Sequence, residues 1–136
     1  MMKKRGIAAV VAGLAATVLG LTPGTASAYD NEPLSASTTG AAVSLTVDWT
    51  GSETFTLRNV KLSDTSCDAH PVYFYVSVPG FQYPNHWNSS GCGTTSNWSS
   101  LSGSEDSGIY SLWVTVCRDT TFDNCSSSHA SLNPYY

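Results

Sequence analysis

Basic residues are scarce in this sequence. The 136 residues hold 6 Lys and Arg against 10 Asp and Glu, and three of the basic residues lie at positions 3–5. If residues 1–28 are removed, three basic and ten acidic residues remain, which gives a net charge of −7. A surface this acidic disfavours nucleic-acid binding and attraction to anionic lipid, because both rely on Lys and Arg beside phosphates. We therefore predict no nucleic-acid partner.

Helical periodicity and recognisable catalytic motifs are also missing from residues 29–136. No G-x-S-x-G pattern is present, which is the turn that exposes the nucleophile of many serine hydrolases. The cysteines include no C-x-x-C pair of the kind that binds zinc. Spaced acids, namely Asp64 with Asp68 and Asp119 with Asp123, do not match the calcium loop of an EF-hand. We therefore predict no enzymatic activity, no metal and no cofactor.

Residues 1–28 have the three parts of a cleavable signal peptide. Residues 3–5 are basic, residues 7–21 form an apolar run of 15 residues, and Ala26-Ser27-Ala28 has the small-x-small pattern of a cleavage site. We expect cleavage after this tripeptide, before Tyr29. The alternative is an uncleaved membrane anchor, but the run is short for a hydrocarbon core of about 30 Å.

No second anchor is visible after residue 28. The first cysteine is Cys67, so none lies at the cleavage site to carry a lipid, and residues 133–136 contain no apolar tail. The sequence thus predicts a monomeric protein that is secreted, extracellular and free of membrane contact after cleavage.

Four cysteines, an even number in a small exported chain, predict two disulfides. Three pairings are open to them, and the pairing that we favour is Cys67–Cys92 with Cys117–Cys125. The alternative is a zinc site, which an oxidising compartment disfavours relative to disulfides.

Alternation of apolar and polar residues predicts β-strands. In residues 42–49, Val43, Leu45 and Val47 alternate with polar residues, which gives a strand with one dry face. In residues 55–62 the apolar positions switch from odd to even, and this predicts a bulge near Asn59. Further strands are predicted at 72–78, around 94–101, at 109–118 and, as a short edge strand, after residue 125.

Several short strands separated by turns, in about a hundred residues, predict an all-β fold: a small, disulfide-bonded antiparallel β-sandwich. Residues 29–40 are small and polar, so we expect them to form a flexible N-terminal arm. Residues 41–136 then form a single β domain.

One local resemblance refines the expected fold. Asp106-Ser107-Gly108-Ile109-Tyr110 resembles the tyrosine corner of immunoglobulin-like domains, in which a Tyr hydroxyl ties a strand to the loop before it. The resemblance implies a Greek-key sandwich and no particular function. Two departures from the pattern are Leu112, where an antibody domain has its second cysteine, and Trp87, which lies farther beyond Cys67 than usual.

A wider resemblance is to small secreted proteins of actinobacteria. The residues that carry it are the signal sequence ending in Ala26-Ser27-Ala28, the Cys117 and Cys125 pair with seven residues between, and the Asn133-Pro134-Tyr135 tail. The resemblance implies an extracellular bacterial protein and assigns no activity.

Aromatic residues in the long stretch 80–108 are the candidate binding site. These four residues are Phe81, Tyr83, Trp87 and Trp98, which sit among Ser, Asn and Gly. Exposed aromatics beside adaptable polar groups are typical of binding surfaces. The alternative is that the rings cover an open end of the sandwich and belong to the core, since a small domain needs every large apolar group.

The sequence therefore predicts a secreted, non-catalytic binding protein that acts on an extracellular protein partner, as an inhibitor or an effector. A rigid, disulfide-bonded scaffold suits this role because preorganised loops lose little entropy on binding. The first alternative is a carbohydrate-binding module with Trp87 and Trp98 as platforms for a glycan. The second is a small hydrolase built around one of His70, His86 and His129.

Overall fold

Ten β-strands and no helix make up residues 30–136, the part of the chain that the computed structural model describes. The predicted signal peptide and its cleavage site lie outside the described residues. No helix of this part is long and apolar enough to cross a membrane. The strands are β1 (Asn31–Thr38), β2 (Ala41–Trp49), β3 (Thr54–Asp64), β4 (Val72–Val78), β5 (Phe81–Gln82), β6 (His86–Asn88), β7 (Thr95–Ser104), β8 (Ser111–Arg118), β9 (Asn124–Ser127) and β10 (Ser131–Leu132).

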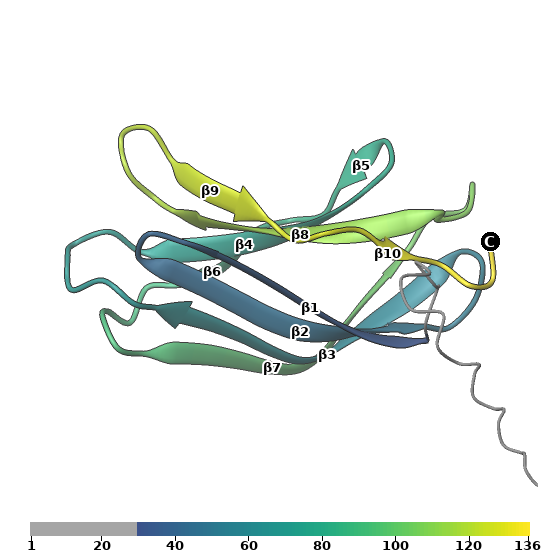
Figure 1. Cartoon of the computed structure of the whole chain (residues 1–136), viewed down its shortest axis with the longest axis horizontal. Helices are drawn as coiled ribbons and strands as arrows, with labels where there is room; N and C mark the ends of the chain where they lie inside the picture. The colour runs from purple at the N-terminus through teal and green to yellow at the C-terminus, as the bar shows by residue number, and fades with distance from the viewer. Residues whose placement is uncertain (1–29) are drawn as a thin grey trace, which may run out of the picture.

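The strands form two antiparallel sheets, which Figure 1 shows as two layers. The first sheet has the order β1-β2-β3-β7, and the second has the order β10-β8-β4-β5, with β6 also paired to β4 and β9 to β8. The chain crosses from the first sheet to the second between β3 and β4, returns between β6 and β7, and crosses again between β7 and β8. The predicted antiparallel β-sandwich is thereby confirmed.

The core lies between the two layers and follows the alternation in the sequence. In β2, Val43, Leu45 and Val47 are at most 4% exposed, whereas Ser44 between them is exposed. The same period of two places the apolar residues of β3, β4 and β8 inside. The largest fully buried side chains are Trp49, Phe74, Leu34, Leu57, Leu62, Ile109 and Leu112.

The predicted bulge at Asn59 is confirmed. Asn59 has a φ of 52°, and the register of β2 against β3 shifts there, because Ser44 pairs with Lys61 whereas Thr46 pairs with Arg58. The extra residue lets both halves of β3 keep their apolar side chains in the core, with Val60 fully buried.

The predicted flexible arm is wrong for residues 31–38. These residues form β1, which pairs with β2 along its whole length. Leu34 and Ala36 face inward and are 2% and 8% exposed. The pattern was weak in the sequence because two inward-facing apolar side chains among polar residues are all that carries it. β1 also lies beside β9, and the Thr38 hydroxyl donates to Asn124 Oδ1 at 2.8 Å.

The tie expected from the Tyr110 hydroxyl is made by another residue. Tyr110 precedes β8 and is 55% exposed, with its ring edge-on to Tyr136 at 5.5 Å. The loop before β8 is held instead by Asn133, whose Nδ2 donates to the Ile109 carbonyl at 2.8 Å and to the Gly51 carbonyl at 3.1 Å. Asn133 therefore holds the β2–β3 connection and the loop before β8 together at this end of the sandwich.

Candidate binding surface at the disulfide end

Four connections meet at one end of the sandwich, at the left of Figure 1: residues 39–40, 65–71, 89–94 and 119–123. The predicted disulfides are confirmed, and both lie here. Cys67–Cys92 joins the second connection to the third, and Cys117–Cys125 closes the hairpin of β8 and β9. We call this end the disulfide end. Cross-linked loops of this kind are held in place before any partner binds.

The loop between β8 and β9 presents the most exposed large apolar side chain of the described residues. Phe122 is 89% exposed. The backbone beneath it is fixed, because Thr120 N donates to Asp123 Oδ1 at 3.1 Å and the Thr120 hydroxyl donates to the Phe122 carbonyl at 2.6 Å. Phe122 is not among the four aromatic residues predicted to bind. The available signal was a single large apolar residue among the seven between Cys117 and Cys125.

An aromatic stack lies on the outer face of the second sheet, next to this loop. Trp87 is 44% exposed, and its ring lies against Tyr73 with centroids 4.6 Å apart. Tyr73 in turn stacks with Tyr75 at 6.4 Å. Trp87 pairs with Tyr73, and Tyr73 with Cys117, so these side chains share one face of the sheet. Trp87 is thus an exposed ring that packs against Tyr73 on one side.

The stack is joined to the loop by a hydrogen bond. The Tyr73 hydroxyl donates to Asp123 Oδ2 at 2.5 Å. Burial raises the pKa of Tyr73 above its usual value, and this bond and the charge of Asp119 raise it further. Tyr73 therefore stays a neutral donor, and the Asp123 carboxylate is held beside the stack. We call Tyr73, Tyr75, Trp87, Asp119, Phe122 and Asp123 together the aromatic–acidic surface.

The four predicted binding aromatics do not form one site, and Trp87 alone belongs to this surface. Phe81 lies at the opposite end, on β5, and is 46% exposed. Tyr83 packs against Phe55 at 5.5 Å and donates its hydroxyl to the Ser104 carbonyl. Trp98 is partly buried against the core. Tyr83 and Trp98 thus pack against the core, which is the alternative that the sequence left open for these rings.

Two of the three basic side chains in residues 30–136 are engaged in ion pairs. Arg58 pairs with Asp48 at 2.9 Å, and Arg118 pairs with Asp68 at 2.8 Å. Lys61 donates to an amide oxygen at 3.1 Å. No salt bridge within the described residues involves the carboxylates of the aromatic–acidic surface. Their negative charge is therefore available to a ligand.

The three histidines lie apart from one another. His129 Nε2 lies 2.8 Å from a carboxylate oxygen of Glu32, and His70 is an exposed loop residue. His86 stacks on Phe74 at 5.0 Å and lies beside Trp98, and burial lowers its pKa below the usual value. Within residues 30–136, no group of three or more His, Cys, Asp or Glu residues is placed to hold a metal ion.

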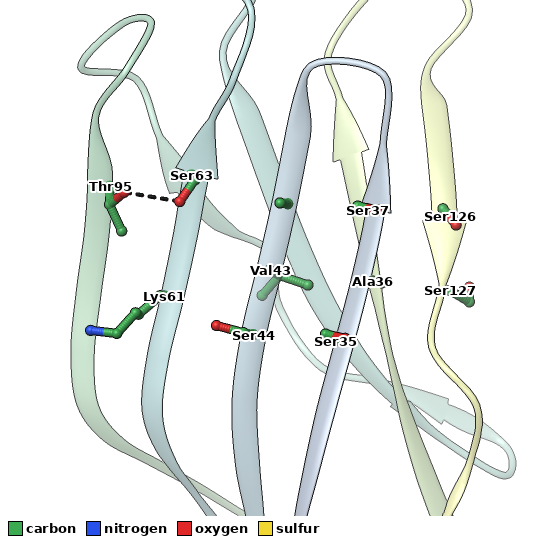
Figure 2. Close-up of a pocket in the computed structure, with 11 residues that line it drawn as sticks. Ser35, Ala36, Ser37, Val43, Ser44, Lys61, Ser63, Thr95, Ser126 and Ser127 are labelled. Atoms are coloured by element: carbon green, nitrogen blue, oxygen red, sulfur yellow. Dashed lines mark hydrogen bonds between the residues drawn. The ribbon is translucent and has the colours of Figure 1, made fainter.

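The outer face of the first sheet has a different chemistry. An open depression lies there, with its lining residues drawn in Figure 2. Its volume is about 520 Å³, and it is lined mainly by small hydroxyl side chains from β1, β2, β3, β7 and β9. Two of these hydroxyls, Ser63 and Thr95, are hydrogen-bonded to each other at 2.9 Å, and Lys61 donates to Asn97 beside the depression. No aromatic residue lines this depression, so it provides no ring on which a ligand can stack.

No known protein family, curated protein or solved structure matches this chain. Function is therefore inferred from the residues of the disulfide end.

Proposed function

We propose that this protein is a secreted, non-catalytic binding protein that captures an extracellular protein partner through its disulfide end. The observation that carries the proposal is Phe122, which is 89% exposed on a loop closed by a disulfide. A large ring in water gains free energy when a partner buries it, roughly 2–3 kcal/mol for a Phe side chain. Aromatic anchors supported by rigid surroundings are typical of interface hot spots.

The rigidity of the disulfide end supports the proposal. The loops are fixed by both disulfides and by the hydrogen bonds beneath Phe122, so little conformational entropy is left to lose on binding. Two disulfides also fit an oxidising extracellular compartment. Export through the predicted signal peptide is part of the proposal.

The test compares three immobilised baits with culture supernatant and cell-wall extract: the wild type, Phe122→Ser, and Phe81→Ser as the matched control. Phe81 is also exposed but lies at the opposite end. We expect a protein that the wild type and the control retain and that Phe122→Ser does not. With the isolated partner, Phe122→Ser should raise the Kd by at least about tenfold, which corresponds to about 1.4 kcal/mol. Equal retention by all three baits would overturn the proposal.

A glycan partner is the second candidate, and the exposed ring of Trp87 on Tyr73 favours it. A flat, supported indole on a sheet face suits stacking of a sugar ring. In that case soluble glycans should change the Trp fluorescence of the wild type, and Trp87→Ala should abolish the change. Phe122→Ser should leave glycan binding intact, which separates this candidate from the first. No change with any glycan tested would reject it.

A further inference from the structure

We infer that the aromatic–acidic surface recognises a positively charged segment of the partner protein, carrying Arg or Lys side chains. This inference rests on the proposed function, because it names the chemistry of the segment that the disulfide end would bind. It is drawn from three features that coincide at this end: an open aromatic face, two carboxylates without a basic partner among the described residues, and the net charge of the domain.

The aromatic face is built to accept a cation. One face of the Trp87 indole lies against Tyr73, so its exposed area is on the other face and the edge. A guanidinium or ammonium group over such a ring is attracted by the negative potential of its π-system. Trp is the strongest side chain for this interaction, and Arg is the commonest partner. Tyr75 extends the aromatic surface beyond Tyr73.

The carboxylates of Asp119 and Asp123 lie beside the stack and form no salt bridge within the described residues. Asp123 accepts hydrogen bonds from two neutral donors, Thr120 N and the Tyr73 hydroxyl, so no cation of the described chain neutralises it. Asp119 is half-buried in the same loop, where its backbone N donates to the Pro71 carbonyl at 3.0 Å. The nearest base in the sequence is Arg118, which is engaged by Asp68. An incoming Arg would find both an aromatic face and a carboxylate.

The charge of the whole domain favours the same ligand. Residues 30–136 contain ten acidic and three basic residues, so the long-range field attracts a basic partner and repels an acidic one. Salt screens such attraction, with a Debye length of about 10 Å at 0.1 M. The binding should therefore weaken as the salt concentration rises.

The experiment titrates the purified protein with three capped peptides, hexa-arginine, hexa-lysine and hexa-glutamate, and follows Trp fluorescence and calorimetry. We expect hexa-arginine to bind most tightly, hexa-lysine more weakly and hexa-glutamate not at all. The double variant Asp119→Asn/Asp123→Asn and the single variant Trp87→Ala should each weaken hexa-arginine binding by about tenfold or more. A rise from 50 to 500 mM NaCl should also weaken it.

The matched control is Glu53→Gln/Asp106→Asn. It also removes two negative charges, but from exposed residues of the β2–β3 and β7–β8 connections, which lie at the opposite end. We expect this control to change the affinity by less than about twofold. If it weakens binding as much as the loop variant does, the effect is a general attraction to an acidic protein and the inference is wrong. Unchanged affinity in Trp87→Ala would likewise overturn it.

The capture experiment distinguishes the two proposals. If hexa-arginine does not bind but a partner is still captured in a manner that depends on Phe122, the inference fails and the proposed function stands. If hexa-arginine binds at the aromatic–acidic surface but no protein is captured, the surface binds cations and the proposed function fails. Circular dichroism and thermal melting confirm that each variant is folded, so that a loss of binding reports on the surface.

Discussion

Removal of the Cys67–Cys92 disulfide should lower stability mainly through the unfolded state. The two cysteines are 25 positions apart, and closing a loop of this size removes chain entropy worth about 3.5 kcal/mol at 25 °C. For the 107 residues of the described domain, the entropy of unfolding is about 0.22 kcal/mol/K. The double variant Cys67→Ser/Cys92→Ser should therefore melt about 15 °C below the wild type.

The native structure has other means of holding these connections in place. Both cysteines are exposed, so the substitutions leave no cavity in the core. Gly93 N donates to the Asp64 carbonyl at 2.8 Å, and Asn88 Nδ2 donates to the Leu62 carbonyl at 3.1 Å. These bonds still fix the β6–β7 connection against β3 when the disulfide is absent. We thus expect a folded variant with a native Trp emission spectrum.

Urea unfolding followed by Trp fluorescence, together with calorimetry, measures the effect. The midpoint should fall, and the m-value should rise slightly because the unfolded chain without the cross-link exposes more surface. A decrease in the free energy of unfolding of less than about 1 kcal/mol would refute the reasoning. So would a variant whose native spectrum has changed, because the loss would then reside in the folded state.

Three further predictions concern two buried amides and one partly buried histidine. Asn88→Ala should cost about 2–3 kcal/mol, because the side chain is 1% exposed and donates to two backbone carbonyls. Asn133→Ala should cost a similar amount, since its Nδ2 serves the carbonyls of two loops. Burial against Phe74 and Trp98 lowers the pKa of His86 below 6.5, so the unfolded chain binds more protons and stability should fall as the pH drops below this value. His86→Phe should reduce that dependence, measured as urea midpoints at pH 7.5 and pH 5.

Each of these predictions has an internal comparison. Asn97 is an exposed amide, so Asn97→Ala should change stability by less than about 0.5 kcal/mol. If it costs as much as the two buried substitutions, burial is not the cause of their effect. His70 is exposed, and His70→Phe should leave the acid dependence of stability unchanged. Equal slopes in the wild type and His86→Phe would show that His86 does not contribute.

Much of the fold could be predicted because its signals are local. The alternation of apolar and polar residues in 42–49 and 72–78 indicates which side chains face the core, because successive side chains of a strand point to opposite faces. The switch of parity near Asn59 indicates a bulge for the same reason. β1 was not predicted because Leu34 and Ala36 alone show the alternation of a strand in this segment. Its strand conformation comes from pairing with β2 and from the neighbouring β9.

The candidate site depends on contacts that the sequence does not encode locally. Trp87 and Trp98 have similar polar neighbours in the sequence, but Trp98 packs against Phe74 while Trp87 projects from the outer face of the second sheet. Phe122 and Asp123 became candidates once the structure placed their loop beside Tyr73, which is 50 positions away from Asp123. Exposure and long-range proximity follow from which strands are neighbours.

The sequence by itself determined the strands β2, β3, β4, β7 and β8, the bulge, the even cysteine count and the acidic charge, because each depends on nearby residues or on composition. Tertiary structure decided the rest. Pairing of β4 with β8 and of β8 with β9 places the disulfide hairpin beside the aromatic stack. Packing of the two sheets against each other determines which aromatic rings are buried. The physical reason is that the burial of a side chain depends on what packs against it. The sequence of a single strand does not specify which residues of the other sheet lie opposite.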